Sequence, residues 1–327
     1  METVDTAPLT SKNTVIGMIG LGDMGSAMAT SIVRTFPLNA YDLRAEAVDR
    51  LVASGVRKAA SLEALANSVD VVILVVLDDA QVEDVVGKLL KHPGKIHTII
   101  ISSTVLPSTA IALGDAARKL GIDMIDAAVT GGTEKASRGT ITVLLGGDEG
   151  PVLRCWPLFK SFGKELFHLG PLGAGSAGKL VNNLLSLGNN ILILEAMQLA
   201  DAYGISEDKV TEFIVVSPGD SHGIRTWGRI DRQRRADPAA GSPIIYEKFA
   251  KDMKTAARAA GQRSVVLPVT AGIGAMIGEK MQARDKLLEE LGSTDPLPHC
   301  TVCGQELAFP YRKAGMHPEC AQGRAVG

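Results

Sequence analysis

Neither an excess of charge nor a long apolar run occurs in this sequence. Its 34 basic residues nearly balance 36 acidic ones, and the net charge of −2 gives no strong electrostatic basis for binding nucleic acid or a membrane. The longest uncharged helical stretch, residues 180–194, contains four asparagines and is too short to span a bilayer comfortably. Residues 1–12 lack the apolar core of a signal peptide, so we expect a disordered segment at residues 1–13 of a cytoplasmic protein.

Apolar residues, by contrast, are abundant. They make up 46% of the 327 residues, which is enough to fill the cores of two domains. In the first half of the chain, strand-like and helix-like stretches alternate. This alternation predicts an α/β fold of the Rossmann type, a doubly wound parallel sheet with helices on both faces. The expected strands are residues 15–20, 38–41, 69–77, 98–103, 124–126 and 140–145.

Strand-like patterns stop after Gly175, and helical patterns continue to about Leu291. We therefore predict an all-α domain after the sheet, with an active site between the two domains. Leucine and isoleucine on nearly every side of the 180–194 helix predict burial all round, partly against another subunit of a homodimer or homotetramer. The expected segments are a disordered tail at 1–13, a dinucleotide-binding domain at 14–169, an interdomain helix at 170–203, a helical domain at 204–292 and a small tail at 293–327.

A glycine-rich loop directly follows the first expected strand and precedes a helix of small residues. In this G-x-G-x-x-G pattern the glycines permit a tight turn, close approach of a pyrophosphate, and close packing of the helix on the strand. The N–H groups and the dipole at the helix N-terminus favour phosphate. The candidates for dinucleotide binding are Gly20, Leu21, Gly22, Asp23, Met24 and Gly25.

Asp42 ends the second expected strand, about 20 residues after the loop. Its carboxylate can accept hydrogen bonds from the adenosine ribose and repel a 2′-phosphate, so we expect NAD, with NADP as the alternative. Arg44 could instead bind a 2′-phosphate, and Asp42 could simply cap the helix that begins near Ala45. Further cofactor candidates at the ends of the next two strands are Val76, Leu77 and Thr104.

Lys179 and Asn183 stand four residues apart at the start of a helix, so their side chains share one face. The lysine can act as a cationic proton donor beside an amide that holds a substrate, or it can extend its ammonium group to water from a buried helix end. Hydride transfer between an alcohol and nicotinamide needs a group that takes the hydroxyl proton and returns it. A protonated lysine can also stabilise charge on a carbonyl oxygen.

A pair of glycines follows the strand that ends near Asp126. Consecutive N–H groups at Gly131 and Gly132 can point into one concavity that suits a carboxylate, and Thr130 adds a hydroxyl. The alternative is an ordinary turn between two strands.

Together these segments resemble the β-hydroxyacid dehydrogenase family, which includes 3-hydroxyisobutyrate dehydrogenases and tartronate semialdehyde reductases. Four motifs occur in the family's order, at residues 20–25, 126–139, 173–183 and 249–252. The resemblance implies that Lys179 is the general acid and base. It further implies that Asn183 and the turn Thr130-Gly131-Gly132 hold the substrate, and that Lys251 and Asp252 lie near the cofactor.

The chain departs from the family pattern at two places. Thr130 stands where serine is usual, although the hydroxyl is retained. Residues 101–104 lack the aspartate that commonly precedes the family's Ser-Thr pair. Ser103 and Thr104 are its candidate contacts with the nicotinamide.

The helical pattern breaks between Ser217 and Pro243. In this segment His222, Arg225 and Trp227 are candidates for selecting the substrate, and a surface loop with one buried tryptophan is the alternative. The charged run at residues 229–235 is expected to be solvated.

The C-terminal tail, outside the family resemblance, contains three of the four cysteines. Its C-x2-C and H-x2-C pairs, which 13 intervening residues separate, match the ligand number and local spacing of a structural zinc site. The expected ligands are Cys300, Cys303, His317 and Cys320. A redox dithiol, unpaired thiols, or His299 as the nitrogen ligand are alternatives. Cys155 is then expected to be a buried side chain.

The sequence therefore predicts an NAD-dependent dehydrogenase or reductase of a small carboxylate substrate, a 3-hydroxy acid or its semialdehyde, with a zinc-binding tail. One alternative is a reductase of another carbonyl or an imine, although related imine-reducing enzymes generally lack the family lysine. Another is a catalytically silent dinucleotide-binding protein that recruits a partner through its tail. Retention of Lys179, Asn183 and Thr130 argues against silence.

Overall fold

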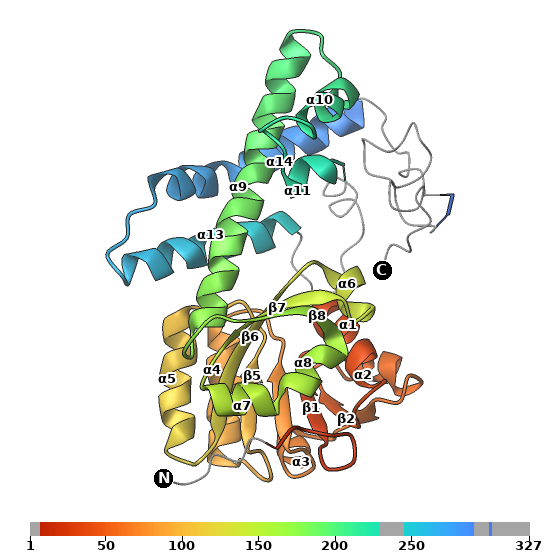
Figure 1. The fold of residues 1–327 in the computed structure, drawn as a ribbon, viewed down its shortest axis with the longest axis vertical. Helices are drawn as coiled ribbons and strands as arrows, with labels where there is room; N and C mark the ends of the chain where they lie inside the picture. Colours follow the sequence, from red (N-terminus) through yellow and green to blue (C-terminus); the bar gives the residue numbers. More distant parts are fainter. Residues whose placement is uncertain (1–6, 229–244, 291–300, 303–327) are drawn as a thin grey trace. The chain divides into compact units, whose positions relative to one another are not determined.

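The chain divides into two compact units in a computed structural model that describes residues 7–228, 245–290 and 301–302 (Figure 1). The units comprise residues 1–181 and 182–327, so the division falls within helix α9 (Ala174–Ala202). No helix in the described ranges is long and apolar enough to cross a membrane.

The first unit is built on one eight-stranded sheet, in the order β3-β2-β1-β4-β5-β6-β7-β8 (Figure 1). Neighbouring strands are parallel except for β6 and β7, which are antiparallel. This sheet confirms the predicted Rossmann-type fold. The strands are β1 (Ile16–Ile19), β2 (Leu38–Tyr41), β3 (Arg57–Lys58), β4 (Val71–Leu74), β5 (Thr98–Ile101), β6 (Asp123–Thr130), β7 (Ile141–Gly146) and β8 (Gly163–His168).

All six expected strands are present, but the sequence did not predict β3 and β8. Strand β3 consists of two exposed charged residues, and β8 is largely exposed and contains Lys164 and Glu165. Neither segment has an alternating apolar pattern. Pairing with β2 and β7 makes them strands, which is a consequence of tertiary contacts.

Helices cover both faces of this sheet because its central strands are apolar on both sides. In β4, Val71 and Ile73 belong to one core with α1, α2, α6, α7 and α8, and Val72 and Leu74 belong to the other core with α3, α4 and α5. The helices are α1 (Asp23–Ile32), α2 (Ala45–Val52), α3 (Leu62–Ala66), α4 (Asp79–Lys91), α5 (Pro107–Arg118), α6 (Thr133–Ser137), α7 (Glu149–Arg154) and α8 (Trp156–Phe162).

Part of the N-terminal segment packs into the core of the first unit. Leu9 is buried in the core, and its N–H donates a hydrogen bond to the carbonyl oxygen of Arg154 at 3.0 Å. The expectation of disorder is therefore wrong for residues 7–13. Cys155 is buried as expected, and burial raises the pKa of its thiol to about 12.

The second unit is helical, and its described residues contain no strand. It comprises the rest of α9 with α10 (Glu207–Ile214), α11 (His222–Arg225), α13 (Ile245–Gly261) and α14 (Pro268–Glu290). Trp227 lies in its core, and its indole N–H donates to the Glu207 carboxylate at 2.6 Å. The Arg284 guanidinium lies 4.9 Å from the Trp227 ring centroid and pairs with Glu207.

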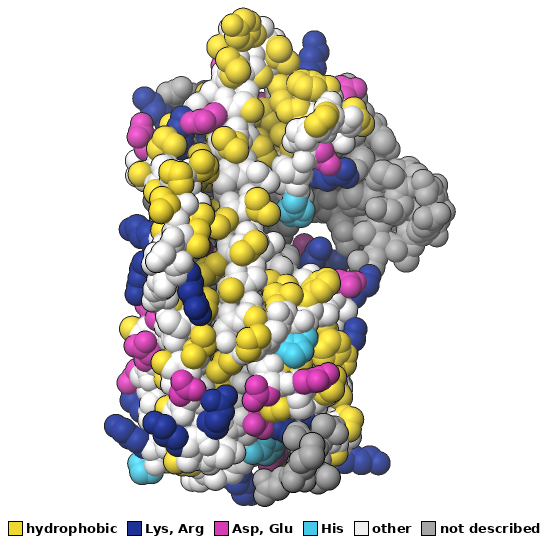
Figure 2. Space-filling model, turned by 60° about the vertical axis from the view of Figure 1, so that its left-hand side comes forward, with side chains coloured by type: hydrophobic (Ala, Val, Ile, Leu, Met, Phe, Trp, Pro, Cys, Tyr) yellow, Lys and Arg dark blue, Asp and Glu magenta, His cyan; other side chains and the backbone are white. Residues whose placement is uncertain are grey.

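Helix α9 is not buried all round within one chain. Four of its apolar side chains, those of Val181, Leu185, Leu192 and Leu199, are between 54% and 66% exposed. Hydrophobic side chains are visible at the surface of the helical unit (Figure 2). These four side chains are exposed in the single chain, so the expected burial all round would require a second subunit.

Candidate functional site

The glycine loop between β1 and α1 has the backbone geometry that its sequence predicts. Gly20 has a φ of 91°, and a Cβ there would lie 2.3 Å from the Val75 carbonyl oxygen. A Cβ at Gly25 would lie 2.0 Å from the Gly20 carbonyl oxygen, so the helix can pack this closely only without a side chain. Nothing lies within 4 Å of a Cβ built on Gly22. The loop therefore leaves open space where a pyrophosphate can approach the backbone.

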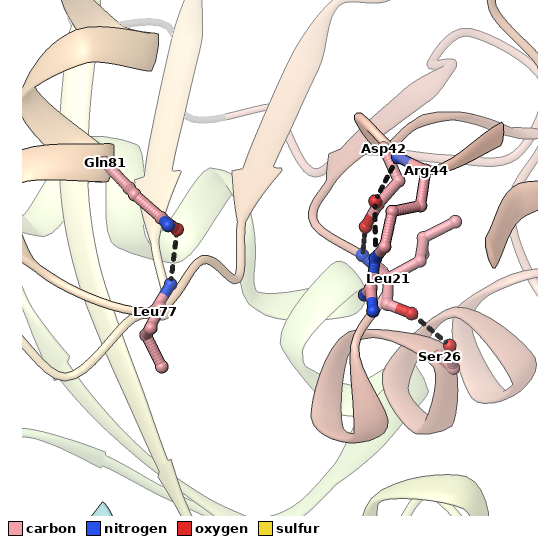
Figure 3. A network of polar contacts seen from close by, with 6 residues as sticks. All are labelled: Leu21, Ser26, Asp42, Arg44, Leu77 and Gln81. Atoms are coloured by element: carbon pink, nitrogen blue, oxygen red, sulfur yellow. Dashed lines mark hydrogen bonds and ion pairs between the residues drawn. The ribbon is translucent and has the colours of Figure 1, made fainter. Parts of the chain in front are cut away.

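Asp42 ties the end of β2 to this loop (Figure 3). The Leu21 N–H donates to Asp42 Oδ2 at 2.7 Å, and the Arg44 N–H donates to Oδ1 at 2.9 Å. The Arg44 Nε is 3.5 Å from the same Oδ1. The N-cap of α2 is Arg44, so Asp42 is not the cap of that helix. Because a carboxylate oxygen can accept more than one hydrogen bond, Oδ2 can still accept one from a ribose hydroxyl.

The loops after β4 and β5 are also joined to each other. The Val76 N–H donates to Ser103 Oγ at 2.8 Å, and Asp79 Oδ1 accepts from the Leu106 N–H at 2.9 Å. The Leu77 N–H donates to Gln81 Oε1 at 3.0 Å (Figure 3). The Ser103 hydroxyl, a candidate nicotinamide contact, thus accepts a bond from the neighbouring loop.

These loops lie at one edge of the sheet. Strands β2, β1, β4 and β5 are adjacent and parallel, so their carboxyl ends bring Asp42, Gly20, Val76 and Thr104 to the same edge. The chain direction across the sheet reverses between β1 and β4, and open α/β sheets bind nucleotides at such a point. The first unit therefore brings these four candidate residues to one edge of its sheet, whereas the candidate Lys251 lies on α13 of the second unit.

Thr130 is the last residue of β6, four residues beyond Asp126, the last residue of the strand that pairs with β5, and the turn continues through Gly131 and Gly132. Thr130 is half-buried, and Gly131 and Gly132 have φ values of 133° and 88°. Two successive residues with positive φ require glycine, so the turn could not form with ordinary side chains. This geometry leads the chain into α6.

Asp126, earlier on β6, holds the start of α9. Its buried carboxylate accepts hydrogen bonds from the Gly173 N–H at 2.7 Å and the Ser176 N–H at 2.5 Å. Burial raises the pKa of Asp126, although these two bonds act in the opposite direction. Asp126 belongs to a motif that we expected to hold substrate, but its carboxylate binds the protein's own backbone. The partners are 47 and 50 residues away, so no local pattern could identify them.

Close packing at two glycines brings α9 against the sheet. A Cβ on Gly175 would lie 2.4 Å from the Leu144 carbonyl oxygen, and a Cβ on Gly146 would lie 2.3 Å from Asp126 Oδ1. Lys179 follows Ser176 by three residues on the same helix and is half-buried. The bonds to Asp126 therefore anchor the helical turn that precedes Lys179.

In the second unit, α9 and α13 bring three polar side chains together. Asn183 is buried, and its Nδ2 donates to Asp252 Oδ2 at 2.8 Å. The Lys251 Nζ lies 3.5 Å from the other oxygen, Oδ1, of Asp252. The contact between Asn183 and Asp252, which are 69 residues apart, was not expected from the sequence.

The candidates for substrate selection after Ser217 have separate surroundings. Trp227 is a core residue, as the alternative interpretation held. The Arg225 guanidinium forms a two-pronged pair with Asp220, at 2.9 and 2.6 Å, and this hydrogen bonding lowers the pKa of Asp220. His222 begins α11. The charged run at 229–235 lies outside the described residues.

The described residues contain no cluster of three or more histidine, cysteine, aspartate or glutamate side chains that could hold a metal ion. The expected zinc ligands Cys300, Cys303, His317 and Cys320, together with the alternative ligand His299, lie outside the described residues.

Comparison with known proteins adds two family matches that together span both units. Residues 15–170 match the NAD binding domain of 6-phosphogluconate dehydrogenase, and residues 173–290 match the NAD-binding domain of NADP-dependent 3-hydroxyisobutyrate dehydrogenase.

Similar proteins cover most of the chain. An NAD-dependent L-serine dehydrogenase of Pseudomonas aeruginosa is 34% identical over 75% of this chain and 85% of its own. A 2-(hydroxymethyl)glutarate dehydrogenase of Eubacterium barkeri is 31% identical over 80% and 87%. The crystal structure of a 3-hydroxyisobutyrate dehydrogenase from Salmonella typhimurium, 29% identical, superimposes with a TM-score of 0.70 over 83% of this chain and 95% of that one.

Proposed function

This chain belongs to the β-hydroxyacid dehydrogenase family, and we propose that it uses Lys179 as general acid and base. Its reaction is the NAD(P)-dependent transfer of hydride between nicotinamide and a small 3-hydroxy acid or its semialdehyde. The observation that carries this assignment is the anchoring of α9. Asp126 holds the start of the helix, and Lys179 and Asn183 follow on one face of it.

The side chains divide the work of the reaction. In oxidation, the Lys179 amine takes the proton of the substrate hydroxyl, and in reduction its ammonium group returns that proton to the carbonyl oxygen. The bound nicotinamide cofactor supplies the hydride chemistry. Asn183 and the turn Thr130-Gly131-Gly132 hold the substrate, the turn by offering N–H groups to its carboxylate.

The two relatives named above suggest a narrower substrate class. L-serine and 2-(hydroxymethyl)glutarate are both 3-hydroxypropanoates that carry a substituent at carbon 2, and both have a primary alcohol. We assign a substrate of this class to the chain, which oxidation would convert to an aldehyde. Turnover of such a compound would also exclude a catalytically silent protein.

At the other end of the cofactor, Asp42 favours NAD. Its carboxylate is only 9% exposed and stands beside the glycine loop, where it can accept from a ribose hydroxyl and repel a 2′-phosphate. The paired Arg44 guanidinium partly offsets that repulsion. Lys251 is assigned to the cofactor on the family motif alone.

We further propose that the chain forms a homodimer or homotetramer through α9. Its exposed apolar side chains at positions 185, 192 and 199 recur every seven residues, which places them along one side of the helix. Covering them with a second copy would remove this apolar surface from water.

We also propose a structural zinc ion in the C-terminal tail. Cys300, Cys303, His317 and Cys320 would supply three thiolates and one imidazole, a ligand set that suits zinc better than hard cations. This proposal rests on the spacing of the ligands in the sequence. Four protein ligands would fill the coordination sphere, which favours a stabilising role over catalysis.

Replacing Lys179 tests the chemistry. In an absorbance assay with NAD and a panel of 2-substituted 3-hydroxypropanoates, Lys179→Ala should lower turnover by about 10²- to 10⁴-fold. Lys179→Arg should also be impaired, because a guanidinium keeps the charge but does not release its proton. NADH affinity should persist in both, and exposed Lys119→Ala is the matched control. Nearly normal turnover of Lys179→Ala would assign proton transfer to another residue.

Replacing Asp42 tests the choice of cofactor. The wild type should have the higher kcat/KM with NAD, and Asp42→Ser should narrow the difference from NADP because the repulsive charge is lost. Arg44→Ala should widen it. A wild type that already prefers NADP would show that Arg44 outweighs Asp42.

Light scattering tests the assembly. The wild type should have about two or four times the mass of one chain, and Leu192→Glu with Leu199→Glu should reduce it by placing charge in the apolar interface. Gln198→Glu, which adds the same charge at an exposed polar position of α9, is the control. A monomeric wild type would contradict the proposal.

Elemental analysis tests the tail. Purified protein should contain about one zinc per chain, and Cys303→Ser should release it. Before chelation, a chromogenic thiol reagent should detect no cysteine, because zinc would hold three of the four thiols and the fourth, Cys155, is buried with a pKa of about 12. After chelation, the reagent should detect the three tail cysteines. Truncation after Gly292 should leave turnover largely intact. Metal-free native protein would defeat the zinc proposal.

A further inference from the structure

The amide of Asn183 is held in one orientation by its surroundings. An ionised carboxylate has only acceptors, so the group of Asn183 that lies 2.8 Å from Asp252 Oδ2 must be the NH₂ group. On its other side, Asn183 Oδ1 accepts a longer hydrogen bond, 3.3 Å, from Asn182 Nδ2. The NH₂ group and the carbonyl oxygen thus have assigned directions before any substrate binds.

Asp252 is well placed to maintain this orientation. Its side chain is largely buried on α13, and Asn183 is buried on α9, so water competes weakly for the bond between them. A hydrogen bond to a charged group is stronger than one between neutral groups, and it polarises the donor amide. The two oxygens of Asp252 serve different neighbours, Oδ2 for Asn183 and Oδ1 for Lys251.

We propose that Asp252 is a positioning residue that sets the orientation of the Asn183 amide, so that the second N–H and the carbonyl oxygen of Asn183 are presented to the hydroxy-acid substrate. This inference rests on the proposed substrate-binding role of Asn183. In this role Asp252 affects substrate binding through its hydrogen bond to Asn183, and not through its ion pair with Lys251. If Asp252 served only to position Lys251, its loss would instead weaken binding of the cofactor, since the family motif associates Lys251 with the cofactor.

Two substitutions separate these roles. Asp252→Ala removes both the acceptor and the charge, and it should lower kcat/KM for the hydroxy acid by about 10-fold or more, because a bond to a charged group is lost at a buried amide. Asp252→Asn keeps an acceptor oxygen for Asn183 but turns an uncharged NH₂ group toward Lys251. It should therefore recover most of the lost kcat/KM. NADH affinity, measured by fluorescence titration without substrate, should be unchanged in both variants.

The experiment is completed by Asn183→Ala alone and combined with Asp252→Ala. In the Asn183→Ala background, loss of Asp252 should have little further effect on kcat/KM, since the group it orients is absent. Lys254→Ala, an exposed change on the same helix, is the matched control. Melting curves of every variant separate unfolding from a change of function, and Asp252→Asn supplies the comparison if Asp252→Ala does not fold.

The outcomes discriminate between the explanations. Equal losses in Asp252→Asn and Asp252→Ala, weakened NADH binding, or additive effects in the double variant would overturn the positioning role. If Asn183→Ala lowers kcat/KM but Asp252→Ala does not, only the positioning role fails. If Asn183→Ala leaves kcat/KM unchanged, the proposed substrate role of Asn183 fails and this inference fails with it.

Discussion

The hydrogen bonds from the start of α9 to the Asp126 carboxylate join the sheet to the helix that carries Lys179 and Asn183. Burying a carboxylate costs free energy unless its oxygens accept hydrogen bonds. The N-terminus of a helix offers both N–H donors and the positive end of the helix dipole. Burial raises the pKa of Asp126, and the hydrogen bonds from the Gly173 and Ser176 N–H groups act against that rise. The small residues at Gly146 and Gly175 are needed because any side chain there would separate the two elements.

The cofactor edge is organised in a similar way, by side chains that accept hydrogen bonds from loop backbone. Asp42 binds the Leu21 N–H of the glycine loop, and Ser103 binds the Val76 N–H of the adjacent loop. Each contact joins the ends of two neighbouring strands. These hydrogen bonds therefore hold the loops in place before a dinucleotide binds. Less conformational entropy of the loops is then lost on binding.

In the helical unit, two polar groups link helices that are distant in sequence. Glu207 on α10 binds both the Trp227 indole and the Arg284 guanidinium on α14. Asp252 on α13 binds Asn183 on α9 and lies near Lys251. The first group surrounds a core tryptophan and stabilises packing. The second contains a residue that we assign to substrate, so the same kind of contact can orient a functional side chain.

Features set by local backbone geometry could be predicted from the sequence. The roles of Gly20 and Gly25 follow from φ and from the space a Cβ would need, and the shared face of Lys179 and Asn183 follows from the helical period. The alternating pattern likewise predicted the sheet. Tertiary structure alone decided that β3 and β8 become strands, that α9 keeps an apolar side exposed, and that Asp126 and Asp252 bind partners 47 to 69 residues away. These outcomes depend on which distant segments pack together, and a local pattern carries no record of that packing.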